Sequence, residues 1–563
     1  MTMDATTFDE AGGPPVSNSG GKAARPTRAR IDAFWQSIER FLIYTGDWLN
    51  PILVKETRQA LKSSQFAITF VLVLVAGWIA TIAVVSFIGP RIFYSADGGT
   101  LLFWYYLILS LPLMVVVPLS AFRSLTAERE DNTYELLSIT TLKPRQIISG
   151  KLGSSIAQMA VYFSAITPCL AFTYLLRGVD LPTIAILLTF AFFWSLGLCM
   201  VGILLATLTE QRFAQVFILV AFVGALFLMF YFSGWLGYYA SYLGRAAAWG
   251  VGNEFWMAVA LMATFYITFF ALAFFASAGM ITFTSESRST PLRICMMVQQ
   301  AAFVGWVSFA WMSSDYEPGI LGVSGCFAAI YWYAMGTMLT AERPGMSQRI
   351  RRRLPQSYFG RMFFSWFNPG PASGYVFVIA NISALALMWL IGTMFSSFFS
   401  TRTRGGWPSA DVMWYLTLTT WGYIVAYLGV GLLLVTALRK FATVTMLACV
   451  LINLLLLLAG FGVPYAIKSM SLKMREADYS FIQLTDPFYS LAHVGDGGVI
   501  SDAAVIGLIV PGVAVCILLL NMPSVIRELR VVRESAPARV ILDEVELHPP
   551  PEAQPQNPWD EPA

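Results

Sequence analysis

Long apolar stretches dominate the sequence, and they restrict the chain to a small set of folds. A helix needs about 20 consecutive apolar residues to cross a hydrocarbon core of about 30 Å. Lipid cannot hydrogen-bond to the backbone, so stretches of this length favour helices over the shorter strands of a barrel. The twelve stretches that qualify are 66–88, 101–121, 154–176, 183–208, 213–233, 256–283, 295–312, 319–338, 375–399, 413–437, 441–467 and 503–522. We therefore predict an all-α polytopic membrane protein with about 12 transmembrane helices.

The overall composition agrees with a membrane location. Hydrophobic residues make up 57% of the 563 residues, and charged residues only 12%. Soluble globular proteins are about 45–50% apolar and about 25% charged, so a soluble enzyme and a disordered chain are both excluded. The formal net charge is only +3, and no overall field attracts a polyanion. We expect no nucleic acid among the partners.

Lys and Arg are distributed unevenly over the predicted loops. Twelve spans place both termini on one side, and 28 of the 36 Lys and Arg residues fall on that side. Basic residues accumulate in cytoplasmic loops, so both termini are predicted to be cytoplasmic. Asp, Glu, Lys and Arg are absent from all twelve stretches. This argues against an ion-coupled carrier, since such carriers place ionisable groups at membrane depth.

Polarity divides the chain into four parts. Residues 1–45 form a Gly- and Pro-rich arm and 531–563 an acidic, Pro-rich tail, and both compositions predict disorder. Between them we expect a six-span unit at 46–290, with a charged cytoplasmic loop at 122–153. A second six-span half is expected at 291–530.

Residues that carry catalysis or bind metals are scarce. The six Cys residues form no CxxC pair, and His493 and His548 are the only histidines. We therefore predict neither a metal site nor His-based catalysis. Gly150-Lys151 is followed by Leu152 and lacks the earlier glycine of a phosphate-binding loop. We expect no catalytic residue and no cofactor in this chain.

A short amphipathic helix is predicted just before the first span. Asn50 can cap it and Pro51 suits its first position. Lys55, Arg58 and Lys62 then recur on one face, with the apolar residues on another. A basic amphipathic helix of this kind lies in the membrane interface with its cations near lipid phosphates. A plain helical lead-in to the first span is the alternative.

The loop at 122–153 mixes charged residues with a possible helix break. Pro144 can occupy a first helical position, which predicts a short helix at 145–151 that runs into the third span. The acidic and basic side chains before Pro144 predict another short charged helix. Such a loop could pass movement from a cytoplasmic partner to the spans, although a solvated charged loop is an equal alternative.

These residues resemble the first cytoplasmic loop of ABC transporter permeases of the ABC-2 class. Loops of that family carry a glutamate-rich start, a Thr-hydrophobic-Glu-Leu-Leu core, a later proline and a Gly-Lys at the next span. The segment that starts at Asn50 is similar to the family's interfacial helix, and six spans match its unit. The matching loop residues are Glu128, Arg129, Glu130, Thr133, Tyr134, Glu135, Leu136, Leu137, Pro144, Gly150 and Lys151.

The resemblance implies the membrane-spanning permease subunit of an ATP-driven exporter in a bacterial cytoplasmic (inner) membrane. The ATPase would be a separate cytoplasmic ABC ATPase chain, which would bind ATP and Mg, and membrane lipids would surround the permease. Docking to the ATPase is expected of the loop, and anchoring of the interfacial helix is expected of Lys55, Arg58 and Lys62. The docking residues would be Glu128, Arg129, Glu130, Glu135, Leu136, Leu137 and Pro144.

The sequence supports and opposes a duplication of the six-span unit about equally. Residues 366–369 echo 48–51, and 435–442 echo 205–214. Asp486-Pro487 resembles a motif before the last span of such permeases. The charged pattern of 122–153, however, suggests no counterpart in the second half. A single chain, a homodimer and a pair with a second permease all remain open.

Three other functions compete with the permease. An ATP-independent secondary carrier with 12 spans shares the layout. A lipid-handling membrane enzyme would need a polar group such as Asp486 or His493 in the outer 468–501 loop. A scaffold that binds an ATPase without transport is the third. The sequence predicts neither the substrate nor the direction of transport.

Overall fold

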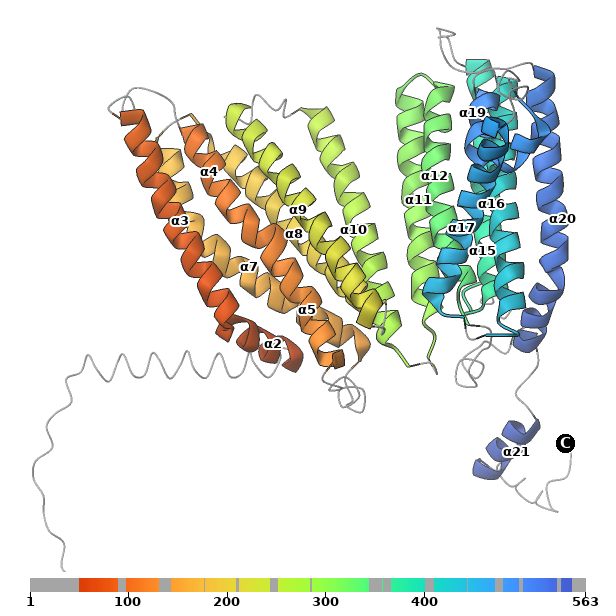
Figure 1. Ribbon diagram of the computed structural model, residues 1–563, viewed down its shortest axis with the longest axis horizontal. Coiled ribbons are helices and arrows are strands. Elements are labelled where there is room, and N and C mark those ends of the chain that lie inside the picture. Colours follow the sequence, from red (N-terminus) through yellow and green to blue (C-terminus); the bar gives the residue numbers. More distant parts are fainter. Residues whose placement is uncertain are drawn as a thin grey trace, which may run out of the picture.

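The computed structural model shows an all-α membrane protein (Figure 1). No strand occurs among the residues that the structure describes. These residues are 50–89, 98–130, 143–176, 178–208, 212–243, 252–283, 286–343, 357, 366–399, 410–442, 444–470, 479–495, 500–533 and 538–548.

Twelve of the described helices are long and apolar enough to cross a membrane, and each matches one of the predicted stretches. The first half holds α2 (Pro51–Lys62), α3 (Ser64–Ile88), α4 (Gly98–Leu111), a π-helical turn (Pro112–Val116), α5 (Val117–Glu130), α7 (Pro144–Leu175), α8 (Leu181–Thr207), α9 (Arg212–Leu243) and α10 (Asn253–Ile281). The second half holds α11 (Ser289–Ser313), α12 (Pro318–Thr340), α15 (Pro371–Phe399), α16 (Ala410–Leu438), α17 (Met446–Met470), a 3-10 turn (Phe481–Thr485), α19 (Pro487–Gly495), α20 (Ile500–Arg533) and α21 (Ala538–Leu547).

The second span is one long helix that is locally underwound into a π turn. Pro112 has no N–H, so the backbone hydrogen-bond ladder is interrupted there, and α4 continues into α5 through Pro112–Val116. The hydroxyl of Ser195 on α8 donates to the Leu113 carbonyl at 2.6 Å. This bond satisfies a carbonyl in the middle of the span, where no water is available.

The first half is built around the α4–α5 span. It packs on α3, α7, α8 and α9, while α10 packs on α7 and α8. Tyr105, Leu109, Leu113 and Leu125 along this span are completely buried. The α4–α5 span is therefore the core helix of the first half.

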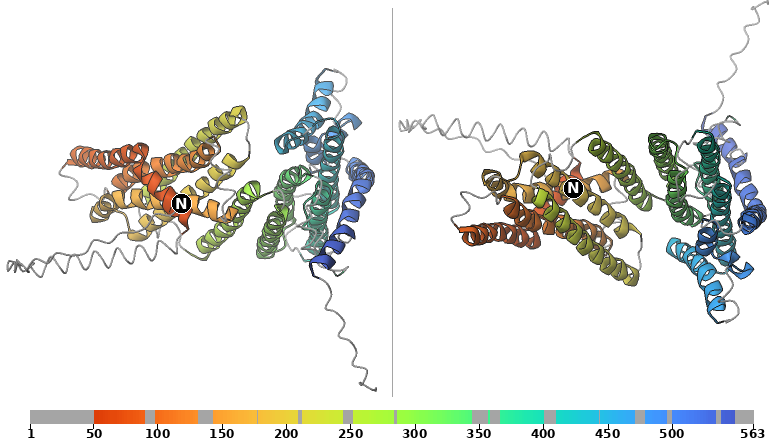
Figure 2. Two further views of the ribbon diagram at one scale, coloured as in Figure 1. Left: turned by 90° about the horizontal axis from the view of Figure 1, so that it is seen from below. Right: turned by 90° about the horizontal axis from the view of Figure 1, so that it is seen from above.

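The second half is organised around α12, α15 and α16. α12 packs on α11, α15, α16 and α17, and α20 packs along α16 and α15. The two halves lie side by side, with α10 next to α11 (Figure 2). Both α2 and the end of α20 lie at the same edge of the molecule, as an even number of spans requires (Figure 1).

The amides that interrupt the apolar stretches mostly bond to other helices or to their own helix. Tyr331 donates to Gln299 Oε1 at 2.6 Å, and Ser120 donates to Gln158 Oε1 at 3.2 Å. Asn381 bonds to its own helix at the Phe377 carbonyl. Such bonds between helices in lipid explain how the 295–312 stretch remains a span despite its glutamines.

The C-terminal tail differs from the prediction of disorder. Ala538–Leu547 forms the helix α21, and α20 itself continues to Arg533. The composition of 531–563 as a whole is Pro-rich, but this ten-residue segment contains no proline and mixes apolar with acidic residues. The predicted N-terminal arm (1–45) lies entirely outside the described residues.

Candidate functional site

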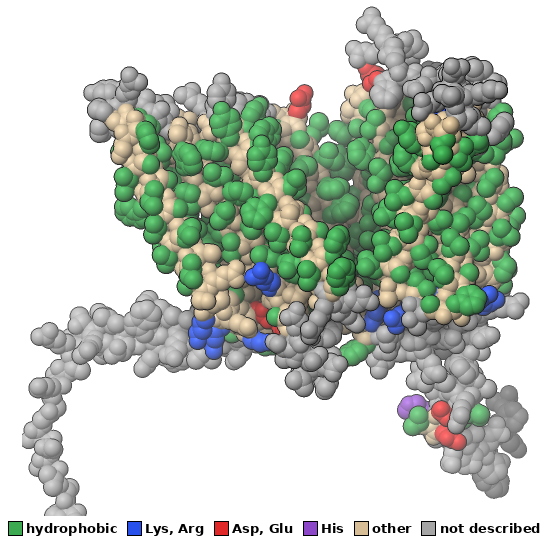
Figure 3. Space-filling view, viewed as in Figure 1, with side chains coloured by type: hydrophobic (Ala, Val, Ile, Leu, Met, Phe, Trp, Pro, Cys, Tyr) green, Lys and Arg blue, Asp and Glu red, His purple; other side chains and the backbone are tan. Residues whose placement is uncertain are grey.

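The predicted amphipathic helix before the first span is α2. The Asn50 side chain accepts a hydrogen bond from the Ile52 N–H at 3.1 Å, and Pro51 takes the first helical position. Lys55, Arg58 and Lys62 are exposed, as expected for the basic face. α2 lies across the start of α7, and Figure 3 shows the Lys and Arg side chains in view gathered along this edge of the molecule.

Two glycines on α7 let α2 approach closely. A Cβ on Gly150 would lie 2.8 Å from Ile52 Cγ2 and 3.1 Å from the Leu53 backbone nitrogen. A Cβ on Gly153 would lie 2.5 Å from Leu53 Cδ1. Small residues allow helices to pack backbone to backbone. The Gly-Lys of the sequence pattern is thus part of a helix contact in this structure.

An ion-pair cluster made of Lys55, Glu56, Glu128 and Lys151 joins three helices at this contact. Lys151 Nζ of α7 lies 3.2 Å from Glu56 Oε1 of α2 and 3.0 Å from Glu128 Oε2 of α5. Lys55 Nζ lies 3.6 Å from Glu128 Oε1. The Lys151 side chain is 1% exposed, Glu56 9% and Glu128 13%, whereas Lys55 is 60% exposed.

Burial dominates the electrostatics of this ion-pair cluster. It raises the pKa of Glu56, and the Lys151 ammonium opposes that rise only in part, while Glu128 adds to it. Lys151 also donates to the Ser124 carbonyl at 3.3 Å. Removing one partner of a buried ion pair leaves an uncompensated charge, so these three helices depend on one another.

The predicted docking residues fall in different places. Glu128 is in the ion-pair cluster, and Pro144 is the first residue of α7, which continues without a break into the third span. Arg129 and Glu130 end α5, and their side chains lie outside the described set, as do Glu135, Leu136 and Leu137 entirely. Glu56 and Lys151 complete the ion-pair cluster. Glu56 could have been noticed in the sequence because it follows Ile52 by four residues on the apolar face.

A second group of charges lies at the same edge of the second half. Arg293 of α11 is completely buried, and its Nη2 donates to Glu342 Oε2 at 2.9 Å. The Gly370 N–H, just before α15, donates to the same carboxylate oxygen at 2.8 Å. Ser289 donates to Glu342 Oε1 at 2.5 Å. We call Ser289, Arg293, Glu342 and Gly370 the Arg293 cluster.

Two further side chains fix the backbone around the Arg293 cluster. Glu528 of α20 accepts hydrogen bonds from the Ala372 and Ser373 N–H groups, at 3.1 Å and 2.9 Å. A carboxylate at a helix N-terminus satisfies unpaired N–H groups and suits the helix dipole. Arg439, the residue just after α16, donates to the Glu342 carbonyl at 2.9 Å. The ends of five helices of the second half, α11, α12, α15, α16 and α20, thus meet here.

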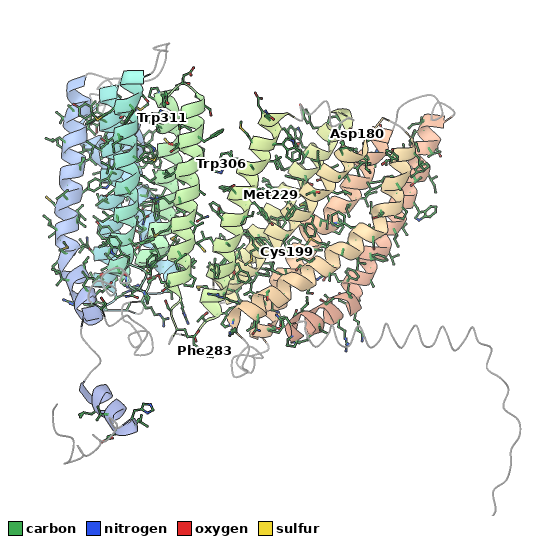
Figure 4. The ribbon with its side chains drawn as sticks, turned by 180° about the vertical axis from the view of Figure 1, so that it is seen from behind. Asp180, Cys199, Met229, Phe283, Trp306 and Trp311 are labelled. Carbon is green, nitrogen blue, oxygen red and sulfur yellow. The ribbon has the colours of Figure 1, made fainter. Side chains whose placement is uncertain are left out.

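An open groove of about 830 Å³ separates the predicted outer parts of α10 and α11. In Figure 4, Trp306 lies in the space between the two halves. Toward the other end, Leu272 and Met296 share a buried cluster, and the rings of Phe269 and Tyr331 lie 6.3 Å apart. The groove is lined by Asn253, Trp256, Met257, Ala260, Thr264, Ala302, Gly305, Trp306 and Phe309.

The polar residues considered for an outer enzymatic site have structural contacts. Asp486 caps α19 by accepting from the Phe488 and Tyr489 N–H groups, and His493 stacks on Tyr479 with centroids 4.6 Å apart. Within the described part of the chain, no group of three His, Cys, Asp or Glu could hold a metal ion. Comparison with family models, curated proteins and solved structures finds no match for this chain.

Proposed function

We propose that this chain is the membrane-spanning permease subunit of an ATP-driven ABC-2 transporter, and that it exports its substrate from the bacterial cytoplasm. The observation that supports this most is the ion-pair cluster. It ties the interfacial helix α2 to the end of the second span and the start of the third. A force applied to the segment between α5 and α7 would therefore move three helices together.

The contacts of α7 offer a route for that movement into the membrane. The Arg145 guanidinium lies over the Phe275 ring of α10, 4.8 Å from its centroid. α10 in turn forms one wall of the groove between the halves. Tilting of α7 by a partner would thus change the wall of the groove. Its apolar lining suits lipid or an apolar substrate.

The secondary carrier remains the competing function. It would need no ATPase, and would draw on an ion gradient. The predicted spans contain no Asp, Glu, Lys or Arg, although backbone carbonyls can also bind ions. The two functions differ in a directly measurable way, because only the permease requires a nucleotide-hydrolysing partner.

The test is purification of the tagged chain from native membranes in mild detergent, with mass spectrometry and an ATP-hydrolysis assay. We expect an ATPase with a phosphate-binding loop to co-purify with the wild type. A Glu130→Ala/Glu135→Ala variant, which leaves the ion-pair cluster intact, should lose it. The matched control is Glu254→Ala/Glu317→Ala, where both residues are exposed at the predicted outer edge. If no ATPase co-purifies with the wild-type chain, the proposal is overturned. Ion-driven uptake would then be tested next.

A further inference from the structure

The C-terminal helix α21 leaves an apolar face exposed. Leu542 and Val545 lie on one face and Asp543 and Glu546 on another, because residues three apart in a helix share a face. All four side chains are exposed, and in Figure 1 α21 stands apart from the spans, beyond the end of α20. A helix of only 10 residues is marginal in water by itself. α21 therefore needs a surface to pack on.

The tether to α20 restricts where that surface can be. α20 ends at Arg533, and α21 begins at Ala538. The chain between these two residues can span at most about 18 Å even when it is fully extended. α21 is therefore confined to the neighbourhood of the end of α20, at the predicted cytoplasmic edge of the second half (Figure 1).

Exposed cations lie at that edge of the second half. They are Arg343 just after α12, Lys440 just after α16 and Arg527 close to the end of α20. None of the three forms an ion pair with another residue that the structure describes. An acidic segment that reaches this edge therefore finds cations that are still available.

Hydrogen bonds hold together the segments that carry these cations. Arg439 donates to the Glu342 carbonyl at 2.9 Å, which joins the residues just after α12 and α16. The Gly370 N–H donates to Glu342 Oε2 at 2.8 Å, and a Cβ on Gly370 would lie 2.5 Å from Glu528 Oε2. The end of α20 therefore lies beside the same residues.

An exposed aromatic ring accompanies the cations. The Trp366 carbonyl accepts a hydrogen bond from Arg293 Nη1 at 2.8 Å, and the Trp366 side chain is exposed. The edge thus offers an apolar contact as well as positive charge. We call Arg343, Trp366, Lys440 and Arg527 the second-half basic surface.

The charge of this edge is opposite to that of α21. From the sequence, 538–547 contains three acidic residues and one Arg, whereas 343–365 contains six Arg and neither Asp nor Glu. Leu125–Arg129 and Leu339–Arg343 both read Leu-Thr-Ala-Glu-Arg, yet 129–143 contains two basic and three acidic residues. The anionic cytoplasmic leaflet of a membrane attracts basic helices, so it repels α21.

We propose that α21 docks on the second-half basic surface of its own chain. Asp543 and Glu546 pair with Arg343 and Lys440, and the apolar face of α21 packs on Trp366. The docked helix covers these cations and excludes other anionic surfaces from this edge. Docking weakens as salt is raised, because exposed ion pairs are screened. This inference does not depend on the proposed function.

Amide hydrogen exchange along 538–547 of the full-length chain in detergent tests the docking. We expect protection at low salt that falls as salt is raised. In the Arg343→Gln/Lys440→Gln variant, exchange should become roughly fivefold faster, as expected for the loss of two exposed ion pairs. The matched control Arg58→Gln/Lys62→Gln removes two exposed cations from α2 and should leave exchange along 538–547 unchanged.

A charge swap tests the pairing itself. Asp543→Lys/Glu546→Lys should lose the protection, and the further changes Arg343→Glu/Lys440→Glu should restore it. The salt dependence of the wild type remains a test if a variant does not fold. Exchange along 538–547 that is equally fast in the wild type and in every variant overturns the docking.

Other occupants of the α21 face give different results. Protection that rises with protein concentration would assign α21 to a second copy of the chain. Protection that appears only with phosphatidylglycerol vesicles would assign it to the membrane, and protection only in the presence of an ATPase would assign it to that partner. Each of these three results also overturns the proposal.

Discussion

Lys151 is the residue on which the contact among α2, α5 and α7 depends. Its ammonium lies within 3.2 Å of Glu56 and 3.0 Å of Glu128, and its side chain is almost fully buried. A long basic side chain near the end of a span usually reaches for the interface. Here it ends between two carboxylates, so its removal leaves both of them without a cation.

Lys151→Met should destabilise the protein strongly. The substitution keeps the apolar stem but leaves two buried carboxylates without their shared cation, and loss of one partner of a buried pair costs about 3–5 kcal/mol. Chemical unfolding in detergent, followed by tryptophan fluorescence, measures the loss. Lys62→Met, at an exposed position of α2, is the control and should change little. Equal stability of both variants would show that Lys151 is not required.

Glu56 should make stability depend on pH. Burial raises its pKa above the ordinary value of 4.5, against the opposing Lys151 and with the help of Glu128. A raised carboxyl pKa adds stability that is complete below pH 4.5 and is lost as pH rises through the folded-state pKa. In thermal unfolding scans from pH 4.5 upward, Glu56→Gln should remove this contribution and flatten the curve. An unchanged slope would contradict the assignment.

Single residues were predictable from the sequence only where local chemistry fixed them. Asn50, Pro51 and Pro144 are at helix starts because capping and the fixed φ of proline act within one turn. The partners Glu56 and Lys151 are 95 residues apart, and local patterns carry no information about such pairing. The docking roles of Glu130, Glu135, Leu136 and Leu137 remain predictions.

At the scale of elements, the contact between α2 and α7 shows what hydropathy leaves open. Length and apolarity predicted all twelve spans, yet the second span continues through a π turn and the third begins ten residues earlier than its apolar stretch. Charged residues at helix ends lie outside any apolar window. The glycines that let α2 approach are equally invisible to a hydropathy count.

Gly150→Val should push α2 away from α7. The new Cβ would fall 2.8 Å from Ile52 Cγ2, and overpacking of this kind costs about 1–3 kcal/mol. Amide hydrogen exchange along 51–62 should then become faster. Ile52→Ala in the same chain should restore part of the protection. Gly224→Ala is the control, because a Cβ at Gly224 meets no atom within 4 Å. Faster exchange along 51–62 in this control as well would refute a local clash.

At the scale of the whole molecule, both described ends of the chain lie at one edge, and the two halves stand side by side (Figures 1 and 2). The sequence predicts the number of spans, but not which helices touch. Spans that are apolar all round present no distinct face, so periodicity cannot show which side packs on protein and which on lipid. That information lies in long-range contacts such as Ser195 with Leu113.

The predicted orientation can be checked with single cysteines in a chain whose own cysteines are replaced. Cysteines at Lys62 and Arg343 should react with a membrane-impermeant maleimide only from the cytoplasmic side. Those at Glu254 and Glu317 should react only from outside, because an odd number of spans separates the positions: five between Lys62 and Glu254, and one between Glu317 and Arg343. All four positions are exposed in the structure. Labelling of Lys62→Cys and Glu254→Cys from the same side would refute the alternation.

The pentapeptide Leu-Thr-Ala-Glu-Arg, which occurs at Leu125–Arg129 and again at Leu339–Arg343, also has an evolutionary consequence. In a homodimer, every mutation appears in both subunits, so the two copies of a site must change together. Here both copies belong to one reading frame, and each can acquire mutations by itself. Selection can then retain Glu128 and Glu342 while the segments that follow them, 129–143 and 343–365, diverge to opposite net charge. Two identical subunits can never diverge in this way.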